Sequence, residues 1–193
     1  RRQVTVEGGI RYGDLGPWLH ERGFALANLA SLPHISVAGA TATATHGSGT
    51  KVGNLATAVA AIEFVNGDGE LATLSRKDDA EFPGAVVNLG ALGVVTSLTL
   101  DVVPAFEVRQ DLFLDLAAAD LVADFDAIMG SGYSVSLFTP WTEDRIQQVW
   151  VKNVAGDFTP PPALARATRA PKKMHPILHI DPIHCTEQFG VAG

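Results

Sequence analysis

Residues 28–49 read Asn28-Leu-Ala-Ser-Leu-Pro-His-Ile-Ser-Val-Ala-Gly-Ala-Thr-Ala-Thr-Ala-Thr-His-Gly-Ser-Gly49, and this stretch is the most informative part of the chain. Small and polar residues fill it, and no Asp, Glu, Lys or Arg lies between Arg22 and Lys51. A compact domain seldom holds so long a segment as a plain loop, and loops of this length usually carry a site. The composition therefore predicts a binding segment here.

The same stretch contains a signal for the start of a short helix. Ser36 is placed to cap a helix through Gly39 and Ala42, because its hydroxyl accepts the free N–H groups of the first turn. Such a helix start, with small residues around it, favours an anion such as a phosphate. Gly47 and Gly49 let the backbone approach a flat or charged ligand closely. An ordinary Ala- and Gly-rich loop packed between sheets is the alternative that the residues leave open.

Strand and helix patterns flank this segment on both sides. Periodicity predicts a helix over 14–22 with Leu15, Trp18 and Leu19 buried and Pro17 in its first turn, and a second helix over 82–89 whose buried face includes Leu89. The Asn-Gly-Asp-Gly sequence at 66–69 predicts a hairpin, because these residues accept positive φ. The expected strands are 4–6, 55–65, 70–74 and 94–103.

A second pattern begins after Pro104. It predicts a strand over 107–114, a helix over 115–128 with Leu121, Phe125 and Ile128 on one face, and strands over 133–138 and 145–152. We therefore expect two domains, 1–104 and 105–193.

Composition excludes several classes of protein. The chain has 193 residues, 47% hydrophobic and 18% charged, with a net charge of −7. A nucleic-acid partner is not expected, because phosphate contacts need clustered Lys and Arg. No apolar run is long enough for a membrane span, and the single cysteine, Cys185, is typical of a reducing compartment, which we take as the cytoplasm. The chain lacks a signal peptide and an initiator Met, so we expect an internal piece of a longer protein.

The stretch 31–49 resembles the flavin-binding domain of the vanillyl-alcohol-oxidase superfamily, and within it the alditol (xylitol) oxidases. Four further segments carry the same resemblance: Asn88–Leu100, Tyr133–Phe138, Lys173–Pro176 and Cys185–Gly190. It implies an α+β fold: the second subdomain of a PCMH-type FAD-binding domain, with a mixed sheet and flanking helices, followed by the start of an α/β cap domain for substrate. It also implies a monomer, FAD as cofactor, and oxidation of the terminal hydroxyl of xylitol or sorbitol to the aldose, with hydrogen peroxide as the second product.

The resemblance also assigns residues. Ser31 corresponds to a residue between the flavin and the polyol, and the full set of implied cofactor-binding residues is Ser31, Ser36, Gly39, Ala42, Thr43, Ala44, Thr45, His46 and Val94. This chain departs from the family at Ala44, where glycine is usual, and at Gly16-Pro17, which interrupts a helix. The family's Gly-Ser-Gly-His-Ser motif for covalent flavin attachment is absent, so the attachment residue is expected upstream and His46 is a different histidine. No catalytic base is implied within this chain.

Other functions stay open at this point. The nearest alternative is an aldonolactone oxidase or dehydrogenase of the gulono- or arabinono-1,4-lactone type, and another is an inactive flavin-binding or structural fragment. The isolated chain is expected to be inactive. His175, His179, His184 and Cys185 would suit zinc, but the prolines among them disfavour a common helix face, so no metal is expected. A serine hydrolase built on Ser48 lacks the Gly-x-Ser-x-Gly setting.

Overall fold

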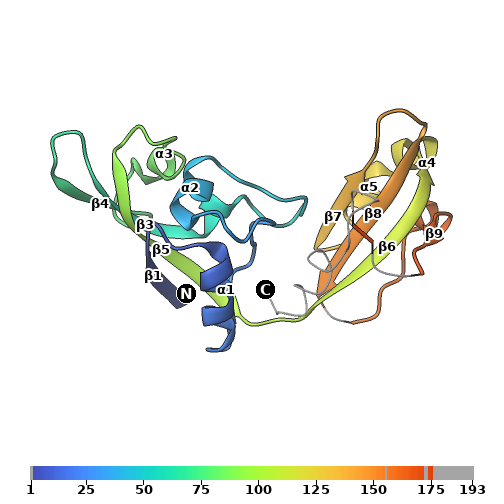
Figure 1. Ribbon diagram of the computed structural model, residues 1–193, viewed down its shortest axis with the longest axis horizontal. Helices are drawn as coiled ribbons and strands as arrows, with labels where there is room; N and C mark the ends of the chain where they lie inside the picture. The colour runs from blue at the N-terminus through green and yellow to red at the C-terminus, as the bar shows by residue number, and fades with distance from the viewer. Residues whose placement is uncertain (1, 155, 172–173, 176–193) are drawn as a thin grey trace. The chain divides into compact units, whose positions relative to one another are not determined.

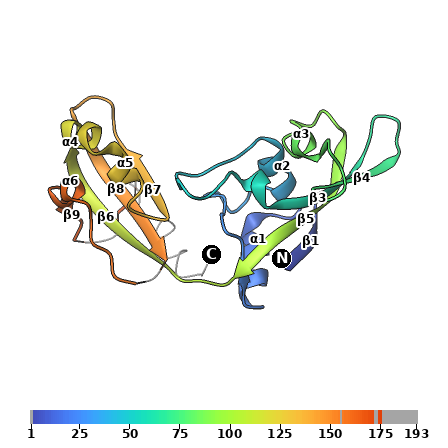
Figure 2. The same ribbon diagram turned by 180° about the vertical axis from the view of Figure 1, so that it is seen from behind.

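The computed structural model describes residues 2–154, 156–171 and 174–175 and divides into two compact units (Figures 1 and 2). Unit 1 contains the residues up to Gly47 together with Gly53–Ala105. Unit 2 contains the short segment Ser48–Val52 and the described residues from Phe106 to His175. Unit 2 is therefore made of two separate stretches of sequence. The first begins within the predicted binding segment, and the second begins after Ala105.

Unit 1 is built on an antiparallel sheet of strand order β1-β5-β3-β4, with a short strand β2 that also pairs with β5. The long strand β5 pairs with β1 on one side and with β3 on the other. Its apolar and β-branched residues suit such an inner strand. The predicted hairpin between β3 and β4 is confirmed: the Asn66 side chain accepts hydrogen bonds from the N–H groups of Asp68 (3.0 Å) and Glu70 (2.9 Å). The strands are β1 (Arg2–Glu7), β2 (Phe24–Ala25), β3 (Val59–Val65), β4 (Leu71–Ser75) and β5 (Val94–Pro104).

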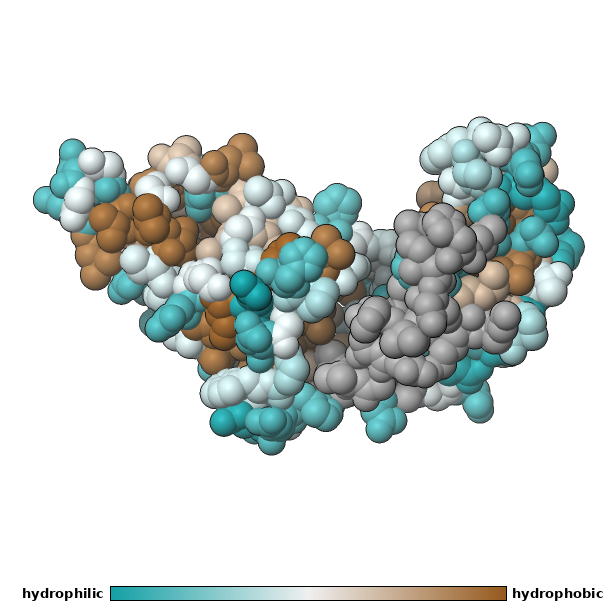
Figure 3. Space-filling view, viewed as in Figure 1, coloured by the Kyte–Doolittle hydropathy of each residue, from teal (hydrophilic) through white to brown (hydrophobic). Residues whose placement is uncertain are grey.

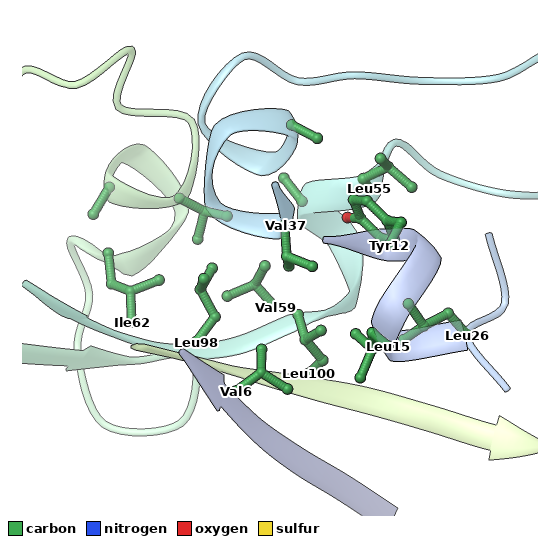
Figure 4. Packing of buried hydrophobic residues seen from close by; sticks show 14 of the residues in the cluster. Val6, Tyr12, Leu15, Leu26, Val37, Leu55, Val59, Ile62, Leu98 and Leu100 are labelled. Atoms are coloured by element: carbon green, nitrogen blue, oxygen red, sulfur yellow. The ribbon is translucent and has the colours of Figure 1, made fainter. Parts of the chain in front are cut away.

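One face of this sheet carries the core of unit 1 (Figure 4). Leu98 and Leu100 of β5 pack with Leu15 of α1 and Val37 of α2, and all four side chains are at most 2% exposed. The helices are α1 (Tyr12–His20), α2 (Val37–Ala42) and α3 (Phe82–Val86), and a 3₁₀ turn, η1 (Leu55–Ala58), precedes β3.

Two of the predicted helices differ in detail from the structure. Helix α1 begins at Tyr12, so its buried face is Tyr12, Leu15 and Leu19, and the prediction that Trp18 is buried was wrong. The Trp18 side chain is 44% exposed, and the Arg22 guanidinium lies over its ring, 3.9 Å from the centroid. Because of this earlier start, Pro17 lies inside the helix and not in its first turn.

Helix α3 ends at Val86, three residues before the predicted end. Leu89, predicted to be buried, has a φ of 53° and is 75% exposed. A non-glycine residue rarely adopts this left-handed conformation, which a helix cannot contain. The chain therefore turns at Leu89 and directs its side chain away from the core.

Unit 2 has its own antiparallel sheet, of strand order β7-β8-β6-β9. Val149 and Val151 of β8 and Val135 of β7 are fully buried, and Ile128 of α5 packs against the same face. The strands are β6 (Val108–Ala117), β7 (Ser134–Phe138), β8 (Arg145–Val154) and β9 (Thr168–Arg169), and the helices are α4 (Ala118–Ala123), α5 (Phe125–Met129) and α6 (Pro162–Ala165).

The single helix predicted over 115–128 is two helices in the structure. The backbone leaves helical geometry at Asp124, with a φ of −126° and a ψ of 31°. This break rotates the second helix relative to the predicted face, so that Ile128 is buried while Phe125 is 50% exposed. Strand β6 also continues to Ala117, beyond its predicted end.

The α+β class predicted from sequence is confirmed. Every strand pair of the described residues is antiparallel, so the sheet expected to be mixed is antiparallel, and unit 2 is likewise α+β where an α/β arrangement was expected. Within the described residues, none of the helices has the length and apolar character needed to cross a membrane.

Candidate functional site

The loop that carries Ser31 is held by the first turn of α1. The N–H groups of Tyr12 and Gly13 donate to the carbonyl oxygens of Ile35 (3.2 Å) and Pro33 (2.8 Å). These contacts satisfy donors that the start of a helix leaves free, and Arg11 at the N-cap makes no side-chain cap. A Cβ on Gly13 would lie 3.0 Å from Pro33, so glycine permits the close approach. Ser31 itself is exposed on this loop.

Ser36 begins helix α2 as predicted. Its hydroxyl accepts a hydrogen bond from the N–H of Gly39 at 3.2 Å, and the N–H of Val37 donates to Ile10 (2.9 Å). The Ser36 side chain is thus committed to the helix start. This leaves a direct contact between Ser36 and the cofactor as a prediction.

Helix α2 ends in a tight turn through Thr43, Ala44 and Thr45. Thr43 donates its hydroxyl to the carbonyl of Gly39 (3.1 Å) and lies 3.3 Å from the Thr45 hydroxyl. Ala44 has a φ of 53°, and its N–H donates to Thr41 at 3.1 Å. A left-handed residue directly after a helix is the usual place for glycine. The structure therefore gives a conformational reason why glycine would be favoured at Ala44, independent of crowding beside a ligand.

The residues after this turn offer backbone donors. The carbonyl of Thr45 accepts the N–H of Leu55 at 2.9 Å, which fixes the start of the loop, while the His46 ring is exposed and lies 3.2 Å from the carbonyl of Gly47. Among the described residues, none of the N–H groups of residues 46–49 donates to another protein atom. Consecutive free N–H groups flanked by small side chains are suited to phosphate or carbonyl oxygens. Within unit 1, the free N–H groups of His46 and Gly47 are therefore suited to oxygens of FAD.

The turn before β5 lies against the end of α2. The N–H of Leu89 donates to the carbonyl of Ala42 at 3.1 Å, which brings the predicted cofactor segment 42–46 beside residues 88–91. Val94 is 70% exposed at the start of β5, in register with Val65 of β3, which in turn pairs with Leu71 of β4. Figure 3 shows apolar surface at this end of unit 1. Val94 is accessible to a ligand, but no described contact joins it to residues 42–46.

Gly49 and Ser48 have neighbours that the sequence did not predict. A Cβ on Gly49 would lie 2.7 Å from the carbonyl oxygen of Tyr133. Close packing within unit 2 therefore requires glycine at this position, whether or not a ligand binds nearby. The Ser48 hydroxyl contacts the hydroxyls of Ser134 (2.8 Å) and Ser136 (3.1 Å). Neither serine is a general base, so this environment does not support the serine-hydrolase alternative.

The zinc alternative is not tested by the structure. His179, His184 and Cys185 lie outside the described residues, as do parts of the resembling segments at 173–176 and 185–190. Among the residues that the structure does describe, His, Cys, Asp and Glu form no group of three that would hold a metal ion.

Burial perturbs one titratable group next to this loop. Tyr12 is 4% exposed in the core of unit 1, and desolvation raises its pKa to about 12. The charged phenolate is disfavoured there because the surrounding side chains are apolar. Tyr12 is therefore a neutral packing residue beneath the Ser31 loop, and not a base.

Comparison with known families identifies the N-terminal part of the chain. Residues 1–75 match the FAD binding domain family. FAD is thus the cofactor of the chain, in agreement with the prediction.

Three relatives bear on the substrate. The chain is 48% identical to an alditol oxidase of Streptomyces over 192 residues, which is 100% of this chain and 45% of that protein. It is 43% identical to an L-gulono-1,4-lactone dehydrogenase of Mycobacterium tuberculosis, and 40% identical to the L-gulonolactone oxidase of Bos taurus, over 55% and 58% of the chain. These two matches cover 24% and 26% of the relatives. The chain therefore spans less than half the length of these relatives.

A solved structure shares the fold. Cholesterol oxidase from Brevibacterium sterolicum superposes with a TM-score of 0.69 over 83% of this chain and 33% of that protein, at 24% identity. The likeness shows that the two chains share a fold over these residues.

Proposed function

We propose that the protein is an FAD-dependent oxidase that converts the terminal hydroxyl of an alditol, such as xylitol or sorbitol, to the aldehyde of an aldose. The observation that carries this proposal is the 48% identity to an alditol oxidase, because it extends over 192 residues and so includes unit 2 as well as unit 1. In this proposal residues 1–104 are the second part of the FAD-binding domain, and residues 105–193 begin the substrate domain.

The proposed flavin contacts gather in unit 1. They are the small residues of α2 and the turn after it, the loop through Ser31 and His46, and Val94 at the start of β5. Bound FAD would accept a hydride from the substrate carbon and pass the electrons to oxygen, with hydrogen peroxide as product. The chain's own share is to present the N–H groups of His46 and Gly47 to cofactor oxygens and to fix the start of this loop through the hydrogen bond from Leu55 to Thr45.

Ser31 is the proposed substrate contact in this chain. The hydrogen bonds from Tyr12 and Gly13 anchor its loop. The Ser31 hydroxyl is exposed, and it takes part in none of the hydrogen bonds among the described residues. A neutral hydroxyl that donates and accepts is suited to a polyol, which presents hydroxyls of the same kind. We name no base among the described residues.

Aldonolactone oxidation is the second candidate. Two relatives that act on gulonolactone match the chain at 43% and 40% identity, but over little more than half of it. Alditols and aldonolactones differ at the reacting carbon, since the first present a flexible primary alcohol and the second a ring. We therefore rank the lactones below the alditols. A flavin-binding fragment without turnover is the third possibility.

Purified full-length protein, loaded with FAD, separates these functions. We would measure hydrogen peroxide and the reduction of an artificial dye with xylitol, sorbitol and L-gulono-1,4-lactone in parallel. Peroxide formation with the polyols supports the proposal, and turnover with the lactone alone supports the second candidate. Dye reduction without peroxide would show that oxygen is not the acceptor, and flavin binding without any turnover would leave only the non-catalytic role.

We further propose that the protein is monomeric and cytoplasmic and acts on small molecules, without a nucleic-acid partner. The single cysteine supports the cytoplasmic location, and the net charge of −7 disfavours a nucleic-acid partner. Cell fractionation and the molar mass in solution test it.

A further inference from the structure

The turn after α2 is held within unit 1 as far as Thr45. The N–H of Thr45 donates to the carbonyl of Ala40 (3.0 Å), and its own carbonyl accepts the N–H of Leu55 (2.9 Å). The two residues that follow differ, because within the described part of the chain the N–H groups of His46 and Gly47 donate to no other residue. Their position therefore depends on contacts other than backbone pairing.

The Asn28 side chain lies at this point of the loop. Its Nδ2 donates to the carbonyl of Gly53 at 2.9 Å, and a Cβ on Gly47 would lie 3.8 Å from its Oδ1, an ordinary van der Waals distance. Gly47 is the last residue of unit 1 before the segment 48–52, and Gly53 is the first residue of unit 1 after it. One amide group therefore lies beside both ends of the unit 1 backbone at this segment.

The backbone that carries Asn28 is anchored in the core of unit 1. Strand β2, which pairs with β5, ends at Ala25, and the next residue, Leu26, is 3% exposed within the hydrophobic core. Asn28 follows two residues later and is half-buried. Its side chain is short, so few rotamers connect the amide to this anchored backbone.

The acceptor of this hydrogen bond belongs to an equally defined turn. A Cβ on Gly53 would lie 2.6 Å from the Thr57 side chain, so glycine permits the close approach. The Thr57 hydroxyl donates to the carbonyl of Asn54 at 2.7 Å, and the Asn54 side chain accepts the N–H of Thr57 at 3.2 Å. These bonds close η1 directly after Gly53, so Asn28 holds a hydrogen-bonded turn and not a free strand of chain.

We infer that Asn28 is a positioning residue for the flavin: its amide holds Gly53 and lies against Gly47, and so fixes the direction of the free N–H groups of His46 and Gly47. The inference rests on the proposed flavin contacts of these residues. Every residue that carries it belongs to unit 1.

The test uses full-length holoenzyme carrying Asn28→Ala or Asn28→Asp. The aspartate has nearly the same size but replaces the donor with a charged oxygen, so it separates the hydrogen bond from the volume of the side chain. We expect both variants to shift the visible absorption spectrum and the midpoint potential of bound FAD. Both should lower kcat with xylitol by about two- to tenfold, the range of one neutral hydrogen bond, and the aspartate should have the larger effect.

Gln3→Ala is the matched control. The Gln3 amide also donates a hydrogen bond within unit 1, to Asp101 at 3.0 Å, but from strand β1 and outside residues 28–57. Hydrogen exchange measured by mass spectrometry then locates the effect. Asn28→Ala should speed the exchange of N–H groups in a peptide that covers residues 43–55, and Gln3→Ala should leave that peptide at the wild-type rate.

An unchanged flavin spectrum, potential and kcat would overturn the inference, even with a lower unfolding temperature or faster exchange, since Asn28 would then serve only the fold. Wild-type values for Asn28→Asp would also overturn it, because the hydrogen bond to Gly53 would then have no effect on the cofactor. The spectrum, potential and exchange rates do not depend on which substrate is correct. Failure of the alditol proposal therefore leaves this test intact.

Discussion

Gly93 passes so close to the end of β3 that a Cβ atom on it would overlap the carbonyl oxygen of Val65. Its φ of 130° is also outside the range of residues with side chains. This close approach fixes the backbone directly before Val94, where β5 begins. The pair therefore links the turn after α3 to the central strand of unit 1.

Gly93→Ala is expected to destabilise the protein by roughly 2–4 kcal/mol, because it adds both backbone strain and a steric overlap. Gly69→Ala, at a φ of 81° with nothing near its Cβ, should cost only the strain, about 1–2 kcal/mol. Gly16→Ala within α1, which has neither feature, should be neutral or stabilising by up to about 1 kcal/mol. Chemical denaturation of the full-length protein gives all three values. Equal effects at Gly93 and Gly69 would show that the overlap with Val65 relaxes without cost.

Ala44→Gly should stabilise the protein by about 0.5–1 kcal/mol. The left-handed conformation costs an alanine about 1–2 kcal/mol, and the greater freedom of glycine in the unfolded chain offsets part of the gain. Thermal unfolding measures the difference. The control is Ala38→Gly, at a helical position of α2, which should destabilise by about 1 kcal/mol. A destabilised Ala44→Gly variant would contradict the positive φ at this position.

Raising the pH should weaken the fold through Tyr12. Its pKa is about 12 in the folded protein against an ordinary value of 10.0. The unfolded chain therefore releases its proton first, so the contribution is complete below pH 10 and is lost as the pH rises toward 12. The loss amounts to roughly 2–3 kcal/mol. We expect Tyr12→Phe to remove this part of the alkaline destabilisation, as measured by the free energy of unfolding at several pH values. An unchanged alkaline slope in the variant would mean that Tyr12 is not the group responsible.

His46→Ala should slow turnover by roughly two- to tenfold, the range of one lost hydrogen bond, while flavin stays attached to the protein. His46 is exposed after the turn of α2, and the covalent attachment residue is expected upstream of this chain. Denaturing the full-length variant and looking for retained yellow colour gives the result. His20→Ala, on the exposed face of α1, serves as control. Complete loss of flavin from a folded variant would identify His46 as the attachment residue instead.

Ser31→Ala should raise KM for polyols by up to roughly tenfold and leave the flavin content nearly unchanged, because it removes one neutral hydrogen bond to substrate. Steady-state kinetics with xylitol and sorbitol, together with the ratio of flavin to protein absorbance, measure both quantities. Leu32→Ala alters the neighbouring residue, which is 56% exposed, without removing a hydroxyl. Identical kinetics for wild type and Ser31→Ala would assign the residue to the loop alone.

Local patterns were sufficient for much of unit 1. The Asn66 hairpin and the Ser36 cap follow from side-chain chemistry that acts within a few residues, and both are present. The Ser31–Gly49 motif string led to FAD through its resemblance to a flavin-binding domain, and the family match over residues 1–75 agrees with it. Helix faces were less predictable. Trp18 and Leu89 were expected in the core, but a two-residue shift in the start of α1 and an early end of α3 expose them.

The α+β class and FAD could be predicted from the chain alone, because a contiguous motif carries the resemblance that implies them, and the binding segment stays a prediction from its composition. Long-range contacts within each unit became visible only in the folded structure. The seat of Ser48 between Ser134 and Ser136, and the passage of Gly93 over Val65, join residues that are far apart in the chain. Contacts of this kind depend on how sheets and turns pack in space, and serine or glycine at a single position carries no sign of the partner that it will meet.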